Sequence, residues 1–103
     1  MDDDLTAFQR DVLYTVASLG DPYGLAIRDE LSDYYGTEVN HGRLYPNLDE
    51  LADRGYLVKT CHDERKNTYS LTDRGRALIV ERHEWEADCI LQRSERPAPE
   101  PTA

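Results

Sequence analysis

The spacing of apolar residues changes period between residues 44 and 71, and this change constrains the fold more than any other feature of the chain. In residues 44–52, three leucines and an alanine recur at positions i, i+4, i+7 and i+8, the spacing of a helix with one buried face. From residue 56 to residue 61 the side chains alternate instead, as they do in a strand. A polar cluster at 63–67 predicts a turn, and residues 68–71 predict the returning strand. The chain is therefore expected to contain a helix followed directly by a two-stranded hairpin.

Three further helices are predicted around this unit. The first begins at Thr6, where Gln9 three residues later completes a capping box, and it ends at residue 19. The second opens at Pro22, since proline is favoured in the first turn of a helix, and it ends at Gly36. Thr72 is expected to cap the last helix, which runs to about residue 93.

The third helix contains a proline near its start. Asn40 is a favourable cap for this helix, and Pro46 removes one backbone hydrogen bond and should loosen the first turn and a half. The predicted order is helix, helix, helix, hairpin, helix. This order predicts a mainly α fold with a small β-hairpin, a winged helix-turn-helix with a long C-terminal helix. In that fold the third helix enters the major groove and the hairpin lies along the DNA backbone.

The length of 103 residues allows one domain. Residues 1–5 are expected to be a disordered polar N-terminus, residues 6–93 the winged-helix domain, and residues 94–103 a disordered proline-rich tail. The sequence has neither an apolar run near 18 residues nor a basic leader, which predicts no membrane association and no secretion. Cys61 and Cys89 lie far apart without a CxxC pattern, which indicates a reducing cytoplasm.

The acidic composition needs an explanation, because a net charge of −9 opposes binding to phosphates. Disorder is one source of such a composition, but the acids are interleaved with regular apolar repeats. A surface adapted to high salt is the preferred interpretation. In molar salt the Debye length falls to roughly 3 Å, so distant carboxylates barely repel DNA.

The charge is unevenly distributed along the chain. Residues 41–76 contain seven Arg or Lys and six Asp or Glu, whereas the remainder contains five basic and fifteen acidic residues. The near-neutral segment coincides with the predicted third helix and hairpin. A surface that faces DNA is therefore expected there.

The residues of this segment resemble the PadR-like family of transcriptional regulators. The resemblance rests on Leu-Tyr-Pro-x-Leu at residues 44–48, with another leucine at residue 51, on Gly-Tyr-Leu-Val at 55–58, and on Tyr-Ser-Leu-Thr-Asp-Arg-Gly at 69–75. Pro-Tyr-Gly at 22–24 is similar to the family's opening of the second helix. Tyr-Tyr-Gly at 34–36 and Asn-His-Gly-Arg at 40–43 resemble compact haloarchaeal and haloviral repressors. The resemblance covers roughly residues 6–92 and implies a DNA-binding regulator, with one long helix in place of a larger dimerisation domain.

Several polar residues of the third helix are candidates to contact DNA. Arg43 is expected to read guanine and Asn47 to read adenine. The alternative is that both are ordinary solvent-exposed side chains of the helix that do not contact DNA. His41 is a phosphate candidate. Asn40 either contacts DNA or serves only as the cap, and Tyr45 either packs in the core or donates a hydrogen bond to a phosphate.

The hairpin contributes a second set of candidates. Arg65, Lys66 and Asn67 form the predicted tip, which in a winged helix faces the neighbouring backbone or the minor groove. A charged turn that is merely solvated is the alternative. Arg74, at the start of the last helix, is a further phosphate candidate.

The long last helix is expected to form a homodimer. A helix of about 20 residues is about 30 Å long, more than so small a domain covers by itself, and an uncovered apolar stripe needs a partner. Ordinary packing within one chain is the alternative. The expected dimer interface consists of two residues of the first helix and three of the last: Phe8, Val12, Leu78, Trp85 and Cys89.

The predicted function is a homodimeric repressor that binds a pseudo-palindromic site in double-stranded DNA at high salt. Its histidines and cysteines are too scattered for a zinc site, and no nucleophile or phosphate-binding glycine motif indicates an enzyme or a cofactor. A small-molecule effector is not identified by the sequence. The alternative function is an acidic winged helix that binds protein, or mimics DNA, without binding DNA itself.

Overall fold

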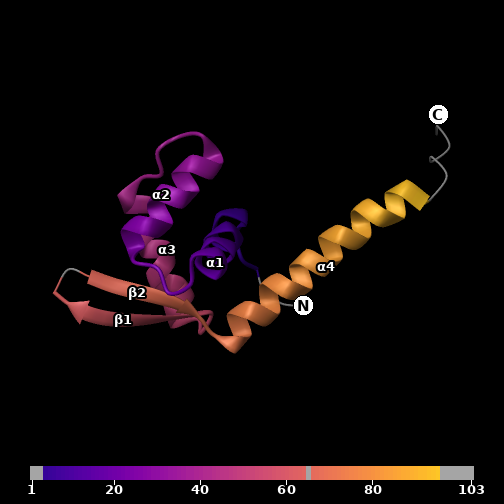
Figure 1. Cartoon of the computed structure of the whole chain (residues 1–103). Helices are drawn as coiled ribbons and strands as arrows, with labels where there is room; N and C mark the ends of the chain where they lie inside the picture. Colours follow the sequence, from indigo (N-terminus) through magenta and orange to yellow (C-terminus); the bar gives the residue numbers. More distant parts are fainter. Residues whose placement is uncertain (1–3, 65, 96–103) are drawn as a thin grey trace.

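The computed structural model of the chain describes residues 4–64 and 66–95. The elements, in chain order, are α1 (Ala7–Leu19), α2 (Gly24–Tyr35), α3 (His41–Asp53), β1 (Leu57–Asp63), β2 (Lys66–Leu71) and α4 (Asp73–Glu95). This order confirms the predicted mainly α winged-helix fold with a long last helix (Figure 1). The expectations for residues 1–3 and 96–103, and for Arg65, lie outside the described residues.

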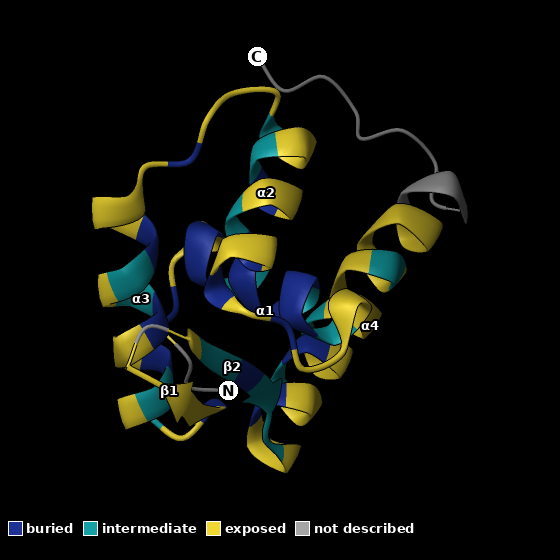
Figure 2. Cartoon of the chain, turned by 60° about the vertical axis from the view of Figure 1, so that its left-hand side comes forward, coloured by how far each residue is buried: buried dark blue, intermediate teal, exposed yellow. Residues whose placement is uncertain are grey.

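The core forms around α1, which lies between α2, α3 and α4 (Figure 2). Thr6 caps α1 as predicted: its side chain accepts the Gln9 N–H, and the Gln9 side chain accepts the Thr6 N–H. Leu5, which was assigned to a disordered terminus, is buried in this core, and its carbonyl accepts a hydrogen bond from Arg10. The packed domain therefore begins before residue 6. The core contains fifteen buried apolar residues, namely Leu5, Phe8, Val12, Leu13, Val16, Ile27, Leu31, Val39, Leu44, Leu48, Leu51, Tyr56, Leu57, Tyr69 and Ile79.

The start of α2 differs from the prediction. The helix begins at Gly24, and the two residues before it are extended because they pair with the hairpin. The Pro22 carbonyl accepts the Tyr69 N–H at 2.9 Å, and Tyr23 forms an isolated antiparallel bridge with Thr68. Proline at this position thus precedes the helix and adds a short third segment to the edge of β2.

The hairpin is longer than predicted, and its turn is shorter. β1 and β2 pair antiparallel from Leu57 opposite Leu71 to Asp63 opposite Lys66, with an irregularity between Cys61 and Asp63. Lys66 and the residue after it therefore belong to β2 and not to the predicted turn of 63–67. One face of the hairpin carries Leu57 and packs on the core.

A compact junction joins the hairpin to α4. The Thr72 hydroxyl donates to the Gly55 carbonyl at 2.6 Å and accepts the Gly75 N–H at 3.0 Å, which caps the helix as predicted. At Gly75 the helix backbone comes so close to the start of β1 that a Cβ would lie 2.2 Å from the Tyr56 carbonyl oxygen. The direction in which α4 leaves the domain is therefore set by contacts at its first turn.

Most of α4 projects from the domain (Figure 1). The Tyr14 hydroxyl donates to the Ile79 carbonyl, and Ile79 is the last buried residue of the helix within the part whose burial is described, which ends at residue 92. A helix of 23 residues is about 35 Å long at 1.5 Å per residue. Within residues 4–64 and 66–95, no helix combines the length and apolar character needed to cross a membrane.

Candidate nucleic-acid interface

The cap and first turns of α3 carry five of the nine predicted contact residues, of which Asn40, His41 and Arg43 are exposed. Asn40 is the cap, because its Oδ1 accepts the Gly42 N–H at 2.6 Å, and its side chain is also exposed. His41 is exposed and lies with its ring centroid 4.2 Å from that of Tyr45. Although Pro46 was expected to loosen this region, α3 runs without interruption from residue 41 to residue 53.

Tyr45 is held against the start of α2. Its ring lies so close to Gly24 that a Cβ there would lie 2.6 Å from the Tyr45 hydroxyl, and any larger residue would require the tyrosine side chain to move. The side chain is half-buried and its ring packs against α2, as the first of the two roles predicts, while the residue also lines an open surface. The hydrogen bond to a phosphate stays a prediction. The Tyr-Gly and Leu-Tyr-Pro motifs therefore meet in one contact between α2 and α3.

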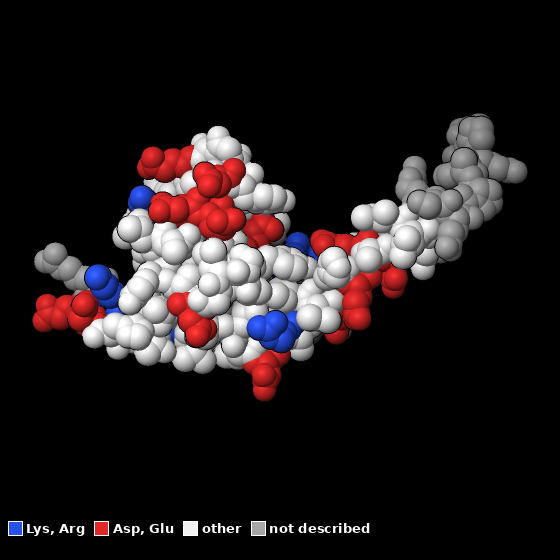
Figure 3. Space-filling view, viewed as in Figure 1, with Lys and Arg blue, Asp and Glu red and all other residues white. Residues whose placement is uncertain are grey.

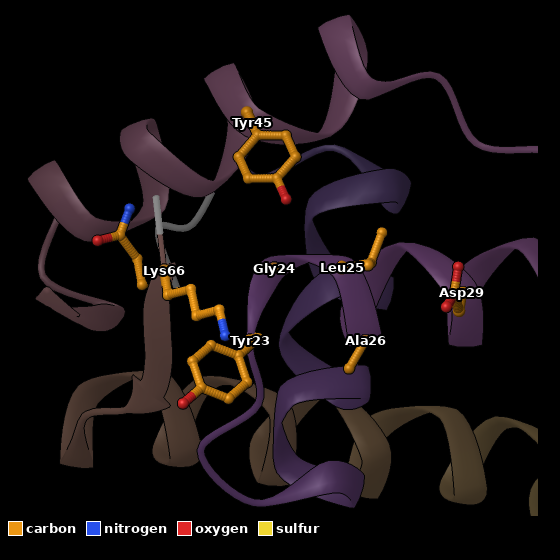
Figure 4. A pocket seen from close by; sticks show the side chains of 8 residues that line it. Tyr23, Gly24, Leu25, Ala26, Asp29, Tyr45 and Lys66 are labelled. Atoms are coloured by element: carbon orange, nitrogen blue, oxygen red, sulfur yellow. The ribbon is translucent and has the colours of Figure 1, made fainter. Parts of the chain in front are cut away.

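A half-open cavity of about 510 Å³ lies between α2, α3 and the end of the hairpin (Figure 4). Lys66 extends across this cavity from β2 toward Tyr23, at the start of α2. Lys66 and the tyrosine hydroxyls there are groups that donate hydrogen bonds to phosphates, whereas the Asp29 carboxylate repels them. The lining residues come from the three elements: Tyr23, Gly24, Leu25, Ala26, Asp29, Tyr45, Lys66 and Asn67.

Arg43 lies on the α1 side of α3. Its guanidinium carbon is 3.9 Å from the centre of the Phe8 ring, a cation–π contact that holds the exposed arginine at the edge of the helix. The Phe8 ring stacks in turn on Tyr35, whose hydroxyl donates to Asp11 at 2.5 Å. Burial and this hydrogen bond raise the pKa of Tyr35, so the phenol remains protonated and keeps donating to Asp11.

Asn47 is not placed as the sequence predicted for a base-reading residue. Its Nδ2 donates to the Arg43 carbonyl at 2.7 Å, and its Oδ1 accepts a hydrogen bond from Gln9 at 3.0 Å. Both ends of the amide are therefore used within the chain. Gln9 was recognised from the sequence only as part of a capping box. Gln9 lies four residues before the buried Leu13, a spacing that puts both residues on the same, buried face of α1.

The hairpin brings two of its predicted residues to the interface. Lys66 is exposed, and Asn67 beside it is half-buried at the cavity. Arg74 does not join them: its guanidinium stacks over the ring of Tyr56, 4.5 Å from its centre, at the opposite end of the hairpin. Lys59 pairs with Asp49 of α3 at 3.3 Å, and this hydrogen bond raises the pKa of the lysine.

The five residues expected at a dimer interface separate into two groups. Val12 is fully buried and Phe8 is 6% exposed, so both belong to the core of the single chain and have little surface for a partner. This corrects the expectation for α1, because its apolar stripe is already covered by the rest of the domain. On α4, Trp85 is 53% exposed, Cys89 is exposed and Leu78 is half-buried.

Acidic side chains gather mainly over α2 and along α4, and one of them, Asp29, lines the cavity. Figure 3 shows them over α2 and along α4, whereas basic and acidic atoms lie side by side at the end of the hairpin. Among residues 4–64 and 66–95, no three His, Cys, Asp or Glu side chains are grouped so as to hold a metal ion.

Comparison with solved structures identifies similar proteins. RosR from H. salinarum is 51% identical with a TM-score of 0.78, over 81% of this chain and 74% of that one. A winged-helix DNA-binding protein from STIV has a TM-score of 0.71 at 20% identity, over 85% of this chain and 96% of that one. FabT from Streptococcus pneumoniae, solved in complex with DNA, has a TM-score of 0.71 at 16% identity, over 92% of this chain and 64% of that one. The last two support the fold alone, and the similarity to RosR supports the haloarchaeal type.

A search of curated proteins found no match. The model of the transcriptional regulator PadR-like family matches residues 12–81. The match includes α2, α3 and the hairpin, with the contact between Gly24 and Tyr45 and the junction at Gly75. The chain therefore belongs to the PadR-like family of transcriptional regulators.

Proposed function

We propose that this regulator binds operator DNA as a homodimer in a cytoplasm of high salt and represses transcription. In this proposal the N-terminal turns of α3 enter the major groove and the end of the hairpin contacts the neighbouring backbone. The observation that carries it is the meeting of α2, α3 and the hairpin around one cavity, with Lys66 exposed at it and His41 exposed beside Tyr45. Arg43 is exposed on the α1 side of the same helix turns. The similarity to RosR supports the proposal, and FabT and the STIV protein show that the fold is that of winged-helix proteins.

A second copy of the chain is expected on α4. Beyond Ile79 the helix has no buried residue up to residue 92, yet several large apolar side chains lie on it. Exposed apolar surface on a projecting helix favours self-association. The proposal requires a dimer whose two α3 helices lie about 34 Å apart, the spacing of successive major grooves. The exposed apolar residues are Val80, Trp85, Ile90 and Leu91. The dimer is proposed to use the face of Trp85, which lies on the same side of the helix as Leu78 and Cys89 and not on that of Val80.

Adaptation to salt is proposed from the acids beside the interface. Asp49 and Asp53 are exposed on α3, and Asp63 and Glu64 are exposed at the end of the hairpin. DNA binding normally weakens with salt, with a slope of about −0.9 for each phosphate contact, because cations are released. When carboxylates approach phosphates, cations are instead taken up, so the slope is expected to be flat or reversed.

The proposal is tested by fluorescence anisotropy in KCl from low to molar concentration. The probe is a labelled duplex selected from genomic fragments, and random duplex is the competitor. Arg43→Ala is expected to weaken specific binding by about tenfold or more, since a base contact contributes about 1–3 kcal/mol. Lys66→Ala should weaken binding to both duplexes alike, as a phosphate contact does.

Arg28→Ala is the matched control, because it removes the same charge from a surface lined by Asp33 and Glu38. Its affinity should equal that of the unmodified chain. Specific binding that persists in molar KCl supports the proposal. A folded chain that binds neither duplex at any salt concentration contradicts it and favours the acidic protein-binding module.

A further inference from the structure

A chain of side-chain hydrogen bonds connects α1 to the part of α3 that begins the interface. Gln9 is 3% exposed, and its amide uses both its oxygen and its nitrogen. Oε1 accepts the Thr6 N–H at 3.1 Å, while Nε2 donates to Asn47 Oδ1 at 3.0 Å and to Glu50 Oε2 at 3.1 Å. A buried amide with both protons and its oxygen bonded has one stable orientation.

The second link of this chain lies beside the proline of α3. Pro46 has no N–H, so the Gly42 carbonyl lacks its usual helical donor, and the backbone ladder is weakened near Arg43. At this place Asn47 Nδ2 donates to the Arg43 carbonyl at 2.7 Å. The Asn47 side chain therefore adds a hydrogen bond to the turn that the proline weakens, at the carbonyl next to the one left without a donor, and Gln9 bonds the asparagine in turn.

We propose that Gln9 and Asn47 are positioning residues that hold the first turns of α3 in the shape needed to discriminate between DNA sequences, without touching a base themselves. The inference rests on the proposed function, because it assumes that these turns meet DNA. It assigns Asn47 a role different from reading adenine, and it gives α1 a part in specificity although Gln9 is buried.

The expected consequence is a loss of specificity greater than the loss of affinity. Base readout depends on the position of the helix within the groove, whereas phosphate contacts depend mainly on charge. If the hydrogen bonds of Gln9 and Asn47 are removed, Arg43 and its neighbours adopt several arrangements, and the affinity for the operator falls toward that for random DNA. Random DNA, which is held through phosphates, should be affected less.

The first test compares Gln9→Met, Asn47→Ala and the double variant by anisotropy on operator and random duplexes. Methionine keeps the volume of Gln9 and removes its hydrogen bonds. Each single variant should lower the ratio of specific to random affinity about tenfold, which corresponds to about 1.4 kcal/mol. The double variant should lower this ratio no more than either single variant does, because both substitutions break the same hydrogen-bonded link between α1 and α3.

Thr15→Val is the matched control. Thr15 is also a buried polar residue of α1, but its hydroxyl donates within the helix, to the Asp11 carbonyl. Its specificity ratio should match that of the unmodified chain. Losses that add in the double variant, or an unchanged ratio in Gln9→Met, would overturn the inference.

The second test uses the free protein and needs no DNA. In Gln9→Met and in Asn47→Ala, hydrogen exchange at the amides of Arg43 and Leu44 should be faster by about tenfold, while that of Leu13 in the core stays unchanged. Unchanged exchange at Arg43 and Leu44 would show that the hydrogen bonds of Gln9 and Asn47 do not hold the first turns of α3. If the unmodified chain binds no duplex, the proposed function fails. If it binds and the ratio does not move, this inference alone fails.

Discussion

At the scale of single residues, two glycines of the family motifs lie where a Cβ would meet neighbouring atoms. Gly24 allows Tyr45 to lie against α2, and Gly75 allows the first turn of α4 to lie against the Tyr56 carbonyl. A Cβ at Gly75 would meet backbone, which cannot rotate away as a side chain can. The sequence motif Leu-Thr-x-x-Gly at residues 71–75 is thus a packing requirement of the junction.

Gly75→Ala is expected to lower the free energy of unfolding by about 1–3 kcal/mol, the usual cost of forcing extra atoms into a packed site. Urea denaturation followed by circular dichroism measures this change. The neighbouring exposed Arg76→Ala is the control and should stay within about 0.5 kcal/mol of the unmodified chain. Equal stability of the two variants would contradict the close approach at the junction.

The residue types at the interface could be predicted from the sequence more readily than their roles. Asn40 was identified as a cap, and the structure confirms that role. Asn47 was interpreted as a base-reading residue from its helical spacing, but its partner Gln9 lies 38 residues earlier, and spacing within one helix carries no information about that contact. The same applies to Arg43, whose neighbour Phe8 belongs to α1.

At the scale of elements, the existence and order of the helices and strands could be predicted, while two boundaries could not. The start of α2 depends on the pairing of Pro22 and Tyr23 with β2, which joins segments about 45 residues apart in the chain. The turn appeared longer than it is because Lys66 and Asn67 are polar, yet they pair across the hairpin with Asp63 and Cys61. Local composition therefore predicts the β1–β2 hairpin correctly but not the residues at which its strands end.

Helix α4 has two exposed apolar surfaces, so the dimer proposal can be tested face by face. Trp85 lies on the same side of the helix as Leu78 and Cys89, whereas Val80 points about 140° away at 100° per residue. Trp85→Asp is expected to give a folded monomer in sedimentation velocity, because a buried charge opposes the interface. Val80→Asp is the control and should remain a dimer. A Trp85→Asp chain that sediments as a folded dimer would exclude this face.

At the scale of the whole molecule, the structure separates a packed domain from a projecting helix. The chain measures 60 × 30 × 22 Å with a radius of gyration of 16.6 Å, whereas about 13 Å is typical of a compact domain of this length. The wing and the start of α3 lie on one side, and the end of α4 lies on the other (Figure 1). This separation allows one end of the protein to dimerise while the other meets DNA.

The central claim is that DNA meets α3 and the hairpin, and amide chemical-shift mapping by NMR in molar KCl tests it most directly. On addition of the operator duplex, the account predicts the largest shifts at residues 40–45 and at Lys66 and Asn67. The core of α1, including Val12, should change little. Shifts confined to α4 or to the acidic surface of α2, with none at residues 40–45, would contradict the account.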